Sequence, residues 1–227
     1  MDKDGISIVF EDDCVIVIKK PAGLATQSSD IRQIDCVTFI KDHIKRENPT
    51  LRSEPYVGVI HRLDQPVEGL LVFTKDKKSA AELSRQLQSD MMNKHYHALV
   101  EGIVDVPSDT KLTGFIYRDK KSGRAFMCDP ASAPSDAKIQ EASLIYRTEK
   151  IHSDKDKTIL SIKLETGRFH QIRAQLSDMG HPIVGDRKYG STVPYPKGIA
   201  LIADRLEFTH PRSGEKVEKI VDFSFRL

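Results

Sequence analysis

The acidic residue Asp64 stands in a polar turn just before an apolar stretch, residues 69–74, and Arg62 precedes it by two positions. A short apolar run bounded by turn residues is typical of a buried strand. Turns between strands lie at the surface, so a carboxylate there stays accessible to a ligand without the cost of burying a charge. Asp64 is therefore the first candidate for a catalytic group. The alternative is a turn residue that accepts backbone hydrogen bonds.

Arg173 is a second candidate because of its predicted place on a helix. On a helix that starts near Arg168, with about 100° per residue, the apolar and polar positions separate into two faces. The apolar stripe consists of Ile172, Leu176 and Met179, and the polar face consists of Gln171, Gln175 and Asp178. Arg173 falls on the other flank of the stripe, where its side chain can follow a cleft wall. The alternative is a surface arginine that snorkels over the core.

Tyr96 is a third candidate, on a predicted strand. Strand alternation puts Tyr96 on the face of Lys94 and Ala98, opposite His95 and His97. The small Ala98 leaves space above the tyrosine ring, although a core tyrosine with a satisfied hydroxyl is the alternative. The two histidines share an orientation suited to a metal, but the sequence supplies no matching third or fourth ligand. No metal site is expected.

The surrounding pattern predicts the elements that position these residues. A hairpin is expected from residues 6–10 and 15–18, and a helix from Lys77 to Met91 behind an Asp76 cap, with Ala80, Leu83, Leu87 and Met91 at helical spacing. Further strands are predicted at residues 139–146 and 158–164. Residues 105–135 are polar and interrupted, so a soft subdomain boundary is expected there within a single domain.

Composition narrows the class of protein only slightly. The chain has 227 residues and a net charge of +2, which is too small to diagnose a nucleic-acid binder. Local basic clusters are candidate phosphate contacts: Lys19-Lys20, Lys41 with Lys45-Arg46, Lys75 with Lys77-Lys78, Lys120-Lys121 with Arg124, and Arg187-Lys188. Three scattered cysteines argue against disulfides. Residues 1–5 are charged rather than apolar and no later stretch approaches the length of a membrane span, so neither a leader nor a span is predicted. A cytoplasmic protein is expected.

Five ordered motifs resemble the RluA-type pseudouridine synthase family, which isomerises uridine in RNA. They are Lys20-Pro21-Ala22-Gly23-Leu24, residues 61–75, residues 94–102, Gly167 to Arg173 followed by residues 180–190, and residues 200–211. The second motif keeps His61, Arg62, Leu63, Asp64, Gly69 and Lys75. It carries Val67 and Glu68 where the family usually has Thr and Ser. This departure bears on the geometry of the loop.

The resemblance implies a role for each matched residue. Asp64 is the implied nucleophile, Arg173 its ion-pair partner, and Tyr96 the ring that stacks beneath the target base. Arg62 is expected to fill the gap that a rotated-out uridine leaves, because its planar group can stack and its charge can hold phosphates. The remaining implied substrate-binding residues are His61, Leu201, Ile172, Arg168 and His170. Leu201 is expected to pack against the uracil.

The resemblance also implies the architecture and the partners. It predicts an α/β (α+β) fold with a mixed, largely antiparallel central sheet, flanking helices and two subdomains around a basic cleft. The family's S4-type RNA-binding domain has no counterpart in this sequence, so a monomer that holds structured RNA, rRNA or tRNA, by its own surface is expected, without a membrane or DNA partner. No cofactor is implied, because the isomerisation involves no redox change and the fragments stay together.

Two other function classes are alternatives to the isomerase. An RNA-binding or ribosome-assembly factor that kept the scaffold but lost turnover could result from Val67 and Glu68. A metal-dependent nucleotide or glycoside hydrolase would need a ligand cluster or a second paired carboxylate, and the sequence offers neither. The presence of Asp64, Tyr96 and Arg173 favours an active isomerase.

Overall fold

The structure is a computed structural model that describes residues 5–28, 30 and 33–227. It divides into two compact units. Unit 1 comprises Met1–Asn93 and Ala203–Asp222, and unit 2 comprises Lys94–Ile202 and Phe223–Leu227. The division therefore does not fall near residues 105–135, where a soft boundary was expected, because that segment lies wholly within unit 2. The first four residues of the charged start, 1–4, lie outside the described residues.

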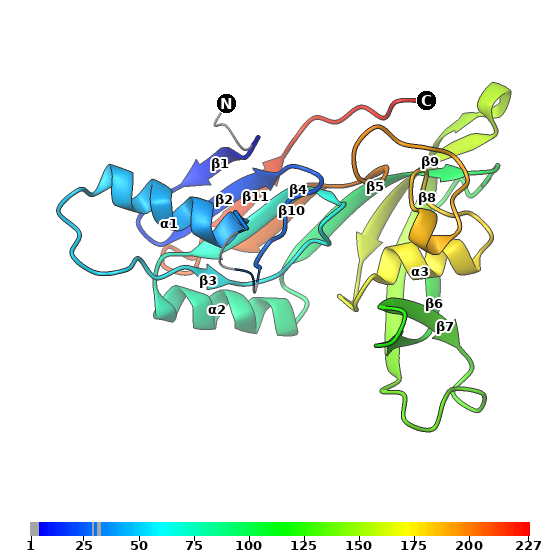
Figure 1. Ribbon diagram of the computed structural model, residues 1–227, viewed down its shortest axis with the longest axis horizontal. Helices are drawn as coiled ribbons and strands as arrows, with labels where there is room; N and C mark the ends of the chain where they lie inside the picture. The colour runs from blue at the N-terminus through cyan, green and yellow to red at the C-terminus, as the bar shows by residue number, and fades with distance from the viewer. Residues whose placement is uncertain (1–4, 29, 31–32) are drawn as a thin grey trace. The chain divides into compact units, whose positions relative to one another are not determined.

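Unit 1 is built on a sheet with the strand order β1-β2-β4-β10 (Figure 1). The strands are β1 (Ser7–Glu11), β2 (Val15–Lys20), β4 (Glu68–Thr74) and β10 (Leu201–Thr209), with β3 (Gly58–Val59) paired to β4 and β11 (Lys216–Ile220) paired to β10. The registers of β1 with β2, β2 with β4, β3 with β4 and β10 with β11 are antiparallel. The predicted hairpin of β1 and β2 is confirmed.

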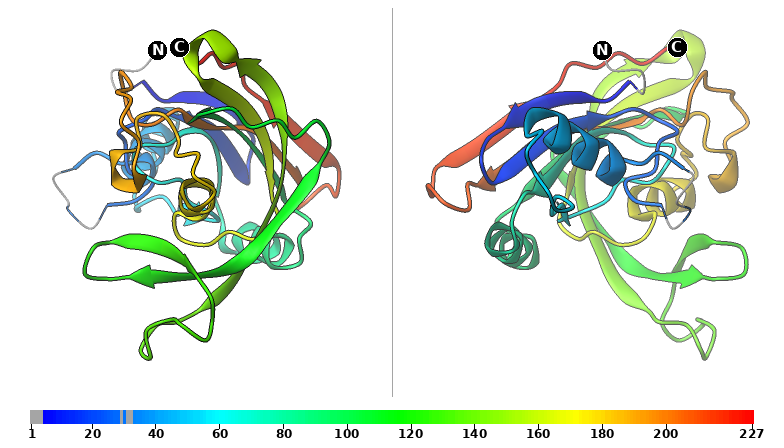
Figure 2. Two further views of the ribbon diagram at one scale, coloured as in Figure 1. Left: turned by 90° about the vertical axis from the view of Figure 1, so that its right-hand side faces the viewer. Right: turned by 60° about the vertical axis from the view of Figure 1, so that its left-hand side comes forward.

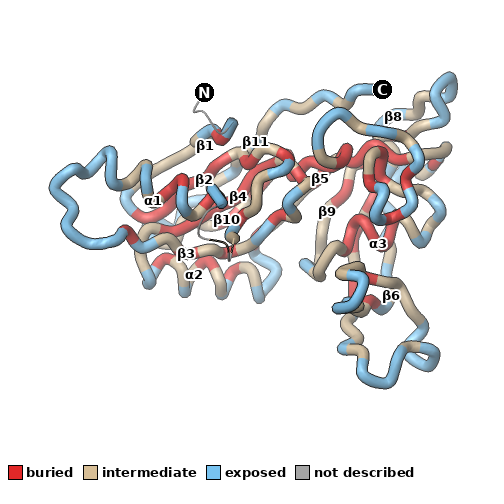
Figure 3. The backbone as a smooth tube through the Cα atoms, in the orientation of Figure 1, coloured by how far each residue is buried: buried red, intermediate tan, exposed pale blue. Residues whose placement is uncertain are grey.

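The core of unit 1 forms where apolar strands meet the apolar side of helix α2 (Lys77–Gln88), while α1 (Cys36–Glu47) buries Phe39 and Ile40. The buried cluster joins β2 and β4 to α2 and β10 through Val17, Val72, Leu83 and Leu206, among others. Figure 3 shows this burial along the strands, whereas the last turn of α1 is exposed.

Helix α2 forms as predicted at its start but ends earlier than expected. Asp76 is the N-cap, and its carboxylate accepts the backbone N–H of Ser79 at 2.8 Å. The helix ends at Gln88 rather than Met91. Asp90 has a left-handed backbone with φ of 54°, and Met91 beyond it is 43% exposed. The apolar spacing therefore continues past the point where the backbone leaves the helix.

Unit 2 contains a second antiparallel arrangement, in the order β5-β9-β8-β6-β7. Its strands are β5 (Asn93–Glu101), β9 (Lys157–Leu164), β8 (Gln140–His152), β6 (Thr110–Asp119) and β7 (Arg124–Cys128). All four neighbouring pairs are antiparallel. The strands predicted at 139–146 and 158–164 are confirmed as β8 and β9. The polar segment 105–135 contains the hairpin of β6 and β7, which packs against α3 (Gln171–Asp178) through Ile116, Ala125 and Ala174 (Figure 2).

Helix α3 begins at Gln171, later than predicted, and of its predicted polar face Asp178 is exposed but the two glutamines are buried. Gln171 and Gln175 are 3% and 1% exposed. The amide nitrogen of Gln171 donates to the Ser143 carbonyl at 3.0 Å, and that of Gln175 donates to the Leu112 carbonyl at 3.3 Å. These two glutamines therefore fasten the helix to β8 and β6, because buried amides need such partners. Two short 3₁₀ turns complete the unit, η1 (Ser153–Lys155) and η2 (Arg187–Tyr189).

The fold class is as expected, with helices packed on largely antiparallel sheet structure. Among residues 5–28, 30 and 33–227, no helix is both long and apolar enough to cross a membrane. Cys14, Cys36 and Cys128 are all free thiols, which agrees with the expected lack of disulfides.

Gly69 is predicted to be essential for the sheet of unit 1. Its φ is +134°, and an added Cβ would lie 2.3 Å from the carbonyl oxygen of Ala203 on β10. Gly69→Ala should lower the free energy of unfolding by about 3 kcal/mol or more, from backbone strain and overpacking together. The control is Gly214→Ala, at φ of +76° with open space around its Cβ, which should lose only about 1–2 kcal/mol. Equal losses in urea unfolding would contradict the close-approach argument.

Candidate active site

Asp64 lies in a closed turn that leads into β4. The N–H of Val67 donates to the Asp64 carbonyl oxygen at 3.0 Å. Leu63 and Val67, on either side of the carboxylate, are 7% and 2% exposed, whereas Asp64 is half-buried and Arg62 is exposed. Apolar anchors thus hold the turn to the core and leave the charged side chain at the surface of unit 1.

A buried lysine braces this turn from beneath. Lys20, at the end of β2, is fully buried, and its Nζ donates to the carbonyl oxygens of Pro21 at 3.0 Å, Leu24 at 2.8 Å and Gln65 at 3.2 Å. Three acceptors match the three protons of an ammonium group, which offsets the cost of its burial. Lys20 is therefore a structural residue, and its expected role as a phosphate contact is wrong.

The loop after Lys20 and the Asp64 turn are also joined by backbone and hydroxyl hydrogen bonds. The N–H of Gly23 donates to the Gln65 carbonyl at 2.8 Å. The hydroxyl of Thr26 donates to the Leu63 carbonyl at 3.0 Å and accepts the Leu63 N–H at 3.2 Å. These hydrogen bonds join two segments about 40 positions apart, and together they hold the turn that contains Asp64.

The two unusual residues of the Asp64 motif fit this arrangement. The Val67 side chain is part of the core, and the carboxylate of Glu68 pairs with Lys19 at 2.8 Å. The hydrogen bond from the Val67 N–H closes the turn without a threonine or serine side chain. Other contacts therefore support the loop at Val67 and Glu68, where the sequence departs from the family pattern.

Arg173, in unit 2, is a buried arginine in a bidentate ion pair. It is 4% exposed, so the alternative of a surface side chain snorkelling over the core is wrong. Its Nε donates to Oδ2 of Asp186 at 2.7 Å and its Nη2 to Oδ1 at 2.9 Å. The guanidinium also lies 4.8 Å from the centre of the Tyr189 ring, within the range of a cation–π contact.

Asp186 is the ion-pair partner of Arg173, a pairing that the sequence analysis missed. It is 1% exposed, and it stands in a stretch that matched the family motif without an assigned role. The signal was an aspartate between an apolar segment and Arg187-Lys188, but a sequence pattern does not show which basic residue such a carboxylate meets. The buried Arg173 is the partner, 13 positions earlier.

His170 connects Arg173 to the aromatic residues of unit 2. It precedes α3 with a left-handed backbone, φ of 53°, and its Nδ1 lies 2.9 Å from the Tyr189 hydroxyl. That hydroxyl also accepts the Ala125 N–H at 2.7 Å, so it lies between β7 and the His170 ring. Burial, together with the positive charges of Arg173 and Lys188, lowers the pKa of His170 to about 3. The ring is therefore neutral near pH 7.

A cation and two rings form a stack beside this histidine. The Phe169 ring lies 3.8 Å from the His170 ring, and the Arg118 guanidinium lies 4.2 Å from the Phe169 ring on the β6–β7 hairpin side. Arg124 contacts the ring faces of Phe126 at 5.0 Å and Tyr189 at 5.1 Å. Exposed Lys120 and Lys121 continue the positive charge at the hairpin turn. Basic and aromatic groups thus alternate over this part of unit 2.

Tyr96, Ile172 and Leu201 lie on the buried side of their elements in unit 2. They are 6%, 4% and 4% exposed. Tyr96 pairs in register with Ile162 of β9, and its neighbour Ala98 on the same face is fully buried. The strand placement predicted for Tyr96 is therefore confirmed.

The structure gives two predicted substrate-binding residues a backbone contact. Nε2 of His61 accepts the N–H of Val72 on β4 at 3.4 Å. Nε of Arg168 donates to the carbonyl of Glu141 on β8 at 2.8 Å. Both contacts hold local structure, and the RNA-contacting roles of His61 and Arg168 stay predictions. His61, Arg62 and Asp64 belong to unit 1, and the other predicted site residues belong to unit 2.

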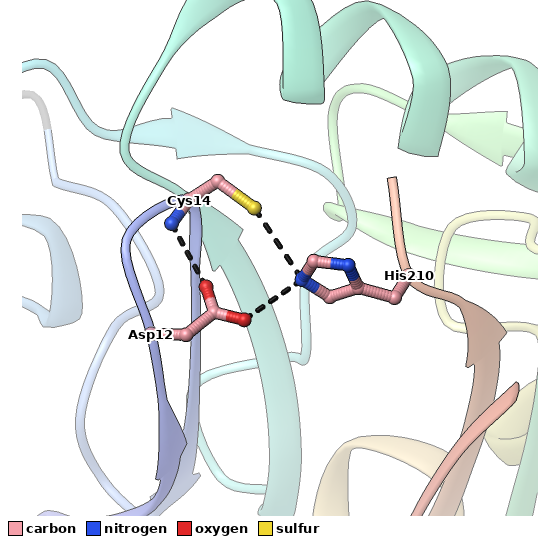
Figure 4. A group of neighbouring side chains, drawn as sticks. All are labelled: Asp12, Cys14 and His210. Carbon is pink, nitrogen blue, oxygen red and sulfur yellow. Dashed lines mark hydrogen bonds and ion pairs between the residues drawn. The ribbon is translucent and has the colours of Figure 1, made fainter. Parts of the chain in front are cut away.

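One group of potential metal ligands lies elsewhere in unit 1, and the sequence analysis did not find it. Asp12, Cys14 and His210 offer one ligand atom each, and these three atoms lie within 4.8 Å of one another (Figure 4). Nε2 of His210 lies 2.7 Å from Oδ2 of Asp12 and 3.4 Å from Sγ of Cys14. Asp12 also accepts the N–H groups of Cys14 and Val15 at 2.8 Å.

The second nitrogen of His210 argues that this group is a hydrogen-bonding cluster. Nδ1 accepts the backbone N–H of Ser213 at 3.0 Å, so the proton of the neutral ring is on Nε2 and points to Asp12. A histidine that binds a metal through Nε2 normally donates from Nδ1, and a backbone N–H is the wrong partner for that. The cluster therefore joins the β1–β2 turn to the end of β10.

The neutral state of His170 predicts a pH dependence of stability. The pKa of His170 is about 3 in the folded protein against 6.5 ordinarily, so between these values the unfolded chain binds a proton that the folded protein excludes. Acidification through this window therefore destabilises the fold. His170→Asn, which tolerates the left-handed backbone, should lose less unfolding free energy than the wild type between pH 7.5 and pH 5 in urea titrations. Equal losses would contradict the assignment.

We predict that the cluster of Asp12, Cys14 and His210 does not bind zinc. The melting temperature should stay the same after EDTA treatment and after addition of equimolar Zn²⁺, because a metal that binds only the folded state would raise it. Cys14→Ser, which weakens zinc ligation, is the matched control for binding elsewhere. A zinc-induced rise in the melting temperature that Cys14→Ser abolishes would establish a metal site.

Comparisons with known proteins agree with these motifs. A family model described as RNA pseudouridylate synthase matches residues 14–178. The ribosomal large subunit pseudouridine synthase D of Nitrosomonas europaea is 35% identical, over 92% of this chain and 60% of its own length. The dual-specificity RNA pseudouridine synthase RluA of Vibrio vulnificus is 31% identical, over 91% of this chain and 78% of its own length.

A solved structure shows the likeness of fold. Human RNA Pseudouridylate Synthase Domain Containing 1 superposes with a TM-score of 0.73 at 23% identity, over 97% of this chain and 84% of that chain. The chain spans 60% of the Nitrosomonas relative, so it matches only part of that protein's length. Because the family model covers residues 14–178, well over half of the sequence, the chain belongs to the RNA pseudouridylate synthase family.

Proposed function

We propose that this protein is an RNA pseudouridine synthase, an isomerase that converts specific uridines of structured RNA to pseudouridine. The observation that carries the proposal is Asp64 itself. In a chain of this family, its carboxylate stands half-buried in a turn that Lys20 and Thr26 hold in place. An acidic residue that only faces solvent does not need a turn held by a fully buried ammonium group. The support of this turn therefore favours a functional role for Asp64.

The reaction breaks the bond between N1 of uracil and C1′ of the ribose, rotates the retained base, and joins C5 to C1′. The hydrogen of C5 leaves to solvent, and N1 gains one. Asp64 either attacks the ribose or assists a glycal-like intermediate, and both routes need an ionised carboxylate. We assign Tyr96 to stacking beneath the base and Arg173 to pairing with the Asp64 carboxylate. The reaction needs no cofactor, because the base never leaves the pocket.

Two sets of basic residues support RNA as the substrate. Arg62 is exposed two positions before Asp64, where a planar cation suits the gap left by a rotated-out nucleotide. In unit 2 the β6–β7 hairpin places Arg118 over the Phe169 ring, which stacks on His170, and carries exposed Lys120 and Lys121 in its turn. Alternating cations and ring faces suit phosphates and unstacked bases. We infer that a monomer acts on rRNA or tRNA in the cytoplasm, with Ile172 and Leu201 beside the base and His61, Arg168 and His170 near the RNA.

Asp64→Asn is predicted to separate binding from catalysis. The amide keeps the size of the side chain but loses its negative charge and nearly all of its nucleophilicity. Pseudouridine formation should therefore fall below detection, while RNA affinity should change little, because phosphate contacts supply most of it. The measurements are release of tritium from RNA labelled at C5 of uridine and a filter-binding titration at fixed salt. Both use cellular rRNA and tRNA from cells that lack the protein.

Asp13→Asn is the matched control for this experiment. Asp13 is exposed in the β1–β2 turn of the same unit, so its substitution removes one negative charge without touching the Asp64 turn. It should release tritium at the wild-type rate. Undiminished release by Asp64→Asn would remove Asp64 from its role. RNA binding without release in the wild type would instead favour the assembly-factor alternative.

A further inference from the structure

We propose that Asp186 is a positioning residue that fixes the guanidinium of Arg173 for its task in the active site. The proposal rests on the proposed function and extends it to a residue with no assigned role. Asp186 contacts Arg173 through both carboxylate oxygens, at 2.7 Å and 2.9 Å. Both side chains are almost completely buried, at 1% and 4% exposed.

The geometry of the ion pair sets the direction of Arg173. Asp186 receives the Nε and Nη2 protons, which lie along one side of the guanidinium. A bidentate pair of this kind fixes the plane of the group as well as its distance. Nη1 takes no part in these two hydrogen bonds. A guanidinium held in this way can direct its other edge at a second carboxylate.

Asp186 can serve as a fixed reference because its own backbone is tightly held. Its N–H donates to the Ile183 carbonyl at 2.9 Å, and its carbonyl oxygen accepts the N–H groups of Tyr189 at 2.9 Å and Ser191 at 3.1 Å. The carboxylate thus projects from a closed loop, so that a bond to it limits the movement of Arg173.

Tyr189 restrains the guanidinium from a second direction. Its ring face lies 4.8 Å from Arg173, and its hydroxyl is held by the Ala125 N–H and by His170. The Ser177 hydroxyl donates to the Tyr189 carbonyl at 2.7 Å, which ties the ring's backbone to α3. An anion along one side and an aromatic face together hold the guanidinium in one place.

A purely structural ion pair between α3 and the loop is the competing explanation. Such a pair would stabilise unit 2, and its loss would lower the melting temperature. It would have no specific effect on a chemical step that passes through Arg173. A positioning role, in contrast, requires that the effect of changing Asp186 disappears once Arg173 is absent.

The test compares Asp186→Asn and Asp186→Glu with the wild type in single-turnover tritium release at saturating enzyme. Misplacement of a catalytic group by about 1 Å slows an enzyme by about 100-fold, so we expect a fall of that order in the rate with little change in RNA affinity. Asp186→Glu keeps the buried charge but moves the fork by one methylene. It therefore tests position even if Asp186→Asn does not fold. The control is Asp35→Asn, a buried N-cap aspartate of α1 in unit 1, which should keep the wild-type rate.

A double-mutant cycle gives the decisive readout. In an Arg173→Met background, Asp186→Asn should cause no further loss of rate, because Asp186 acts through the guanidinium. Wild-type rates for both Asp186→Asn and Asp186→Glu, or full additivity with Arg173→Met, would overturn the positioning role. Absence of tritium release by the wild type is a different result, because it would overturn the proposed function before Asp186 is tested.

Discussion

A positive charge inside a protein must be hydrogen-bonded or paired, and both units bury such a charge among the residues that the structure describes. In unit 1 the charge is the ammonium of Lys20, with three carbonyl acceptors. In unit 2 it is the guanidinium of Arg173, with Asp186 and the Tyr189 ring. Removing one partner from a buried ion pair costs about 3–5 kcal/mol, because the other charge stays buried. The loops that supply these partners are therefore strongly constrained.

This constraint explains how the loops gain a definite shape without regular secondary structure. The carbonyl of Gln65 can accept from Lys20 only if the turn after Asp64 closes over the end of β2, so burial of the lysine and placement of the carboxylate depend on one another. In unit 2, the positive charge of Arg173 raises the electrostatic cost of a second positive charge nearby. His170 stays neutral there, with its pKa lowered to about 3 by burial and by Arg173. Polar groups near both candidate catalytic positions thus have defined charge states and directions.

The parts of this structure that depend on local pattern were predictable from the sequence. The β1–β2 hairpin, the Asp76 cap of α2 and the strand placement of Tyr96 all follow from alternation, spacing or a capping residue. Family motifs make Asp64 and Arg173 candidate catalytic residues, and these roles stay predictions. The features that were missed depend on partners distant in the sequence. The helical pattern predicts that Gln171 and Gln175 face solvent. It does not show that their side chains donate to the carbonyls of Ser143 and Leu112.

Distant partners also explain why the sequence did not predict the burial of Lys20, the pairing of Asp186 with Arg173, or the cluster of Asp12, Cys14 and His210. Lys20 follows Ile16 and Ile18 on one face of β2, which was a signal of burial, but its acceptors lie in two separate loops. Asp12 and His210 are nearly 200 positions apart, and only the fold brings them together. The end of α2 was missed because Asp90 leaves the helix through a left-handed conformation that apolar spacing does not encode.

The central claim is that this chain isomerises uridine in cellular RNA through the carboxylate of Asp64. The most direct measurement is a map of pseudouridines across all RNA from cells with the gene deleted, compared with the same cells expressing the wild type or Asp64→Asn. The account predicts that at least one uridine loses its modification on deletion, regains it with the wild type, and stays unmodified with Asp64→Asn. Identical maps in all strains, or full restoration by Asp64→Asn, would contradict it.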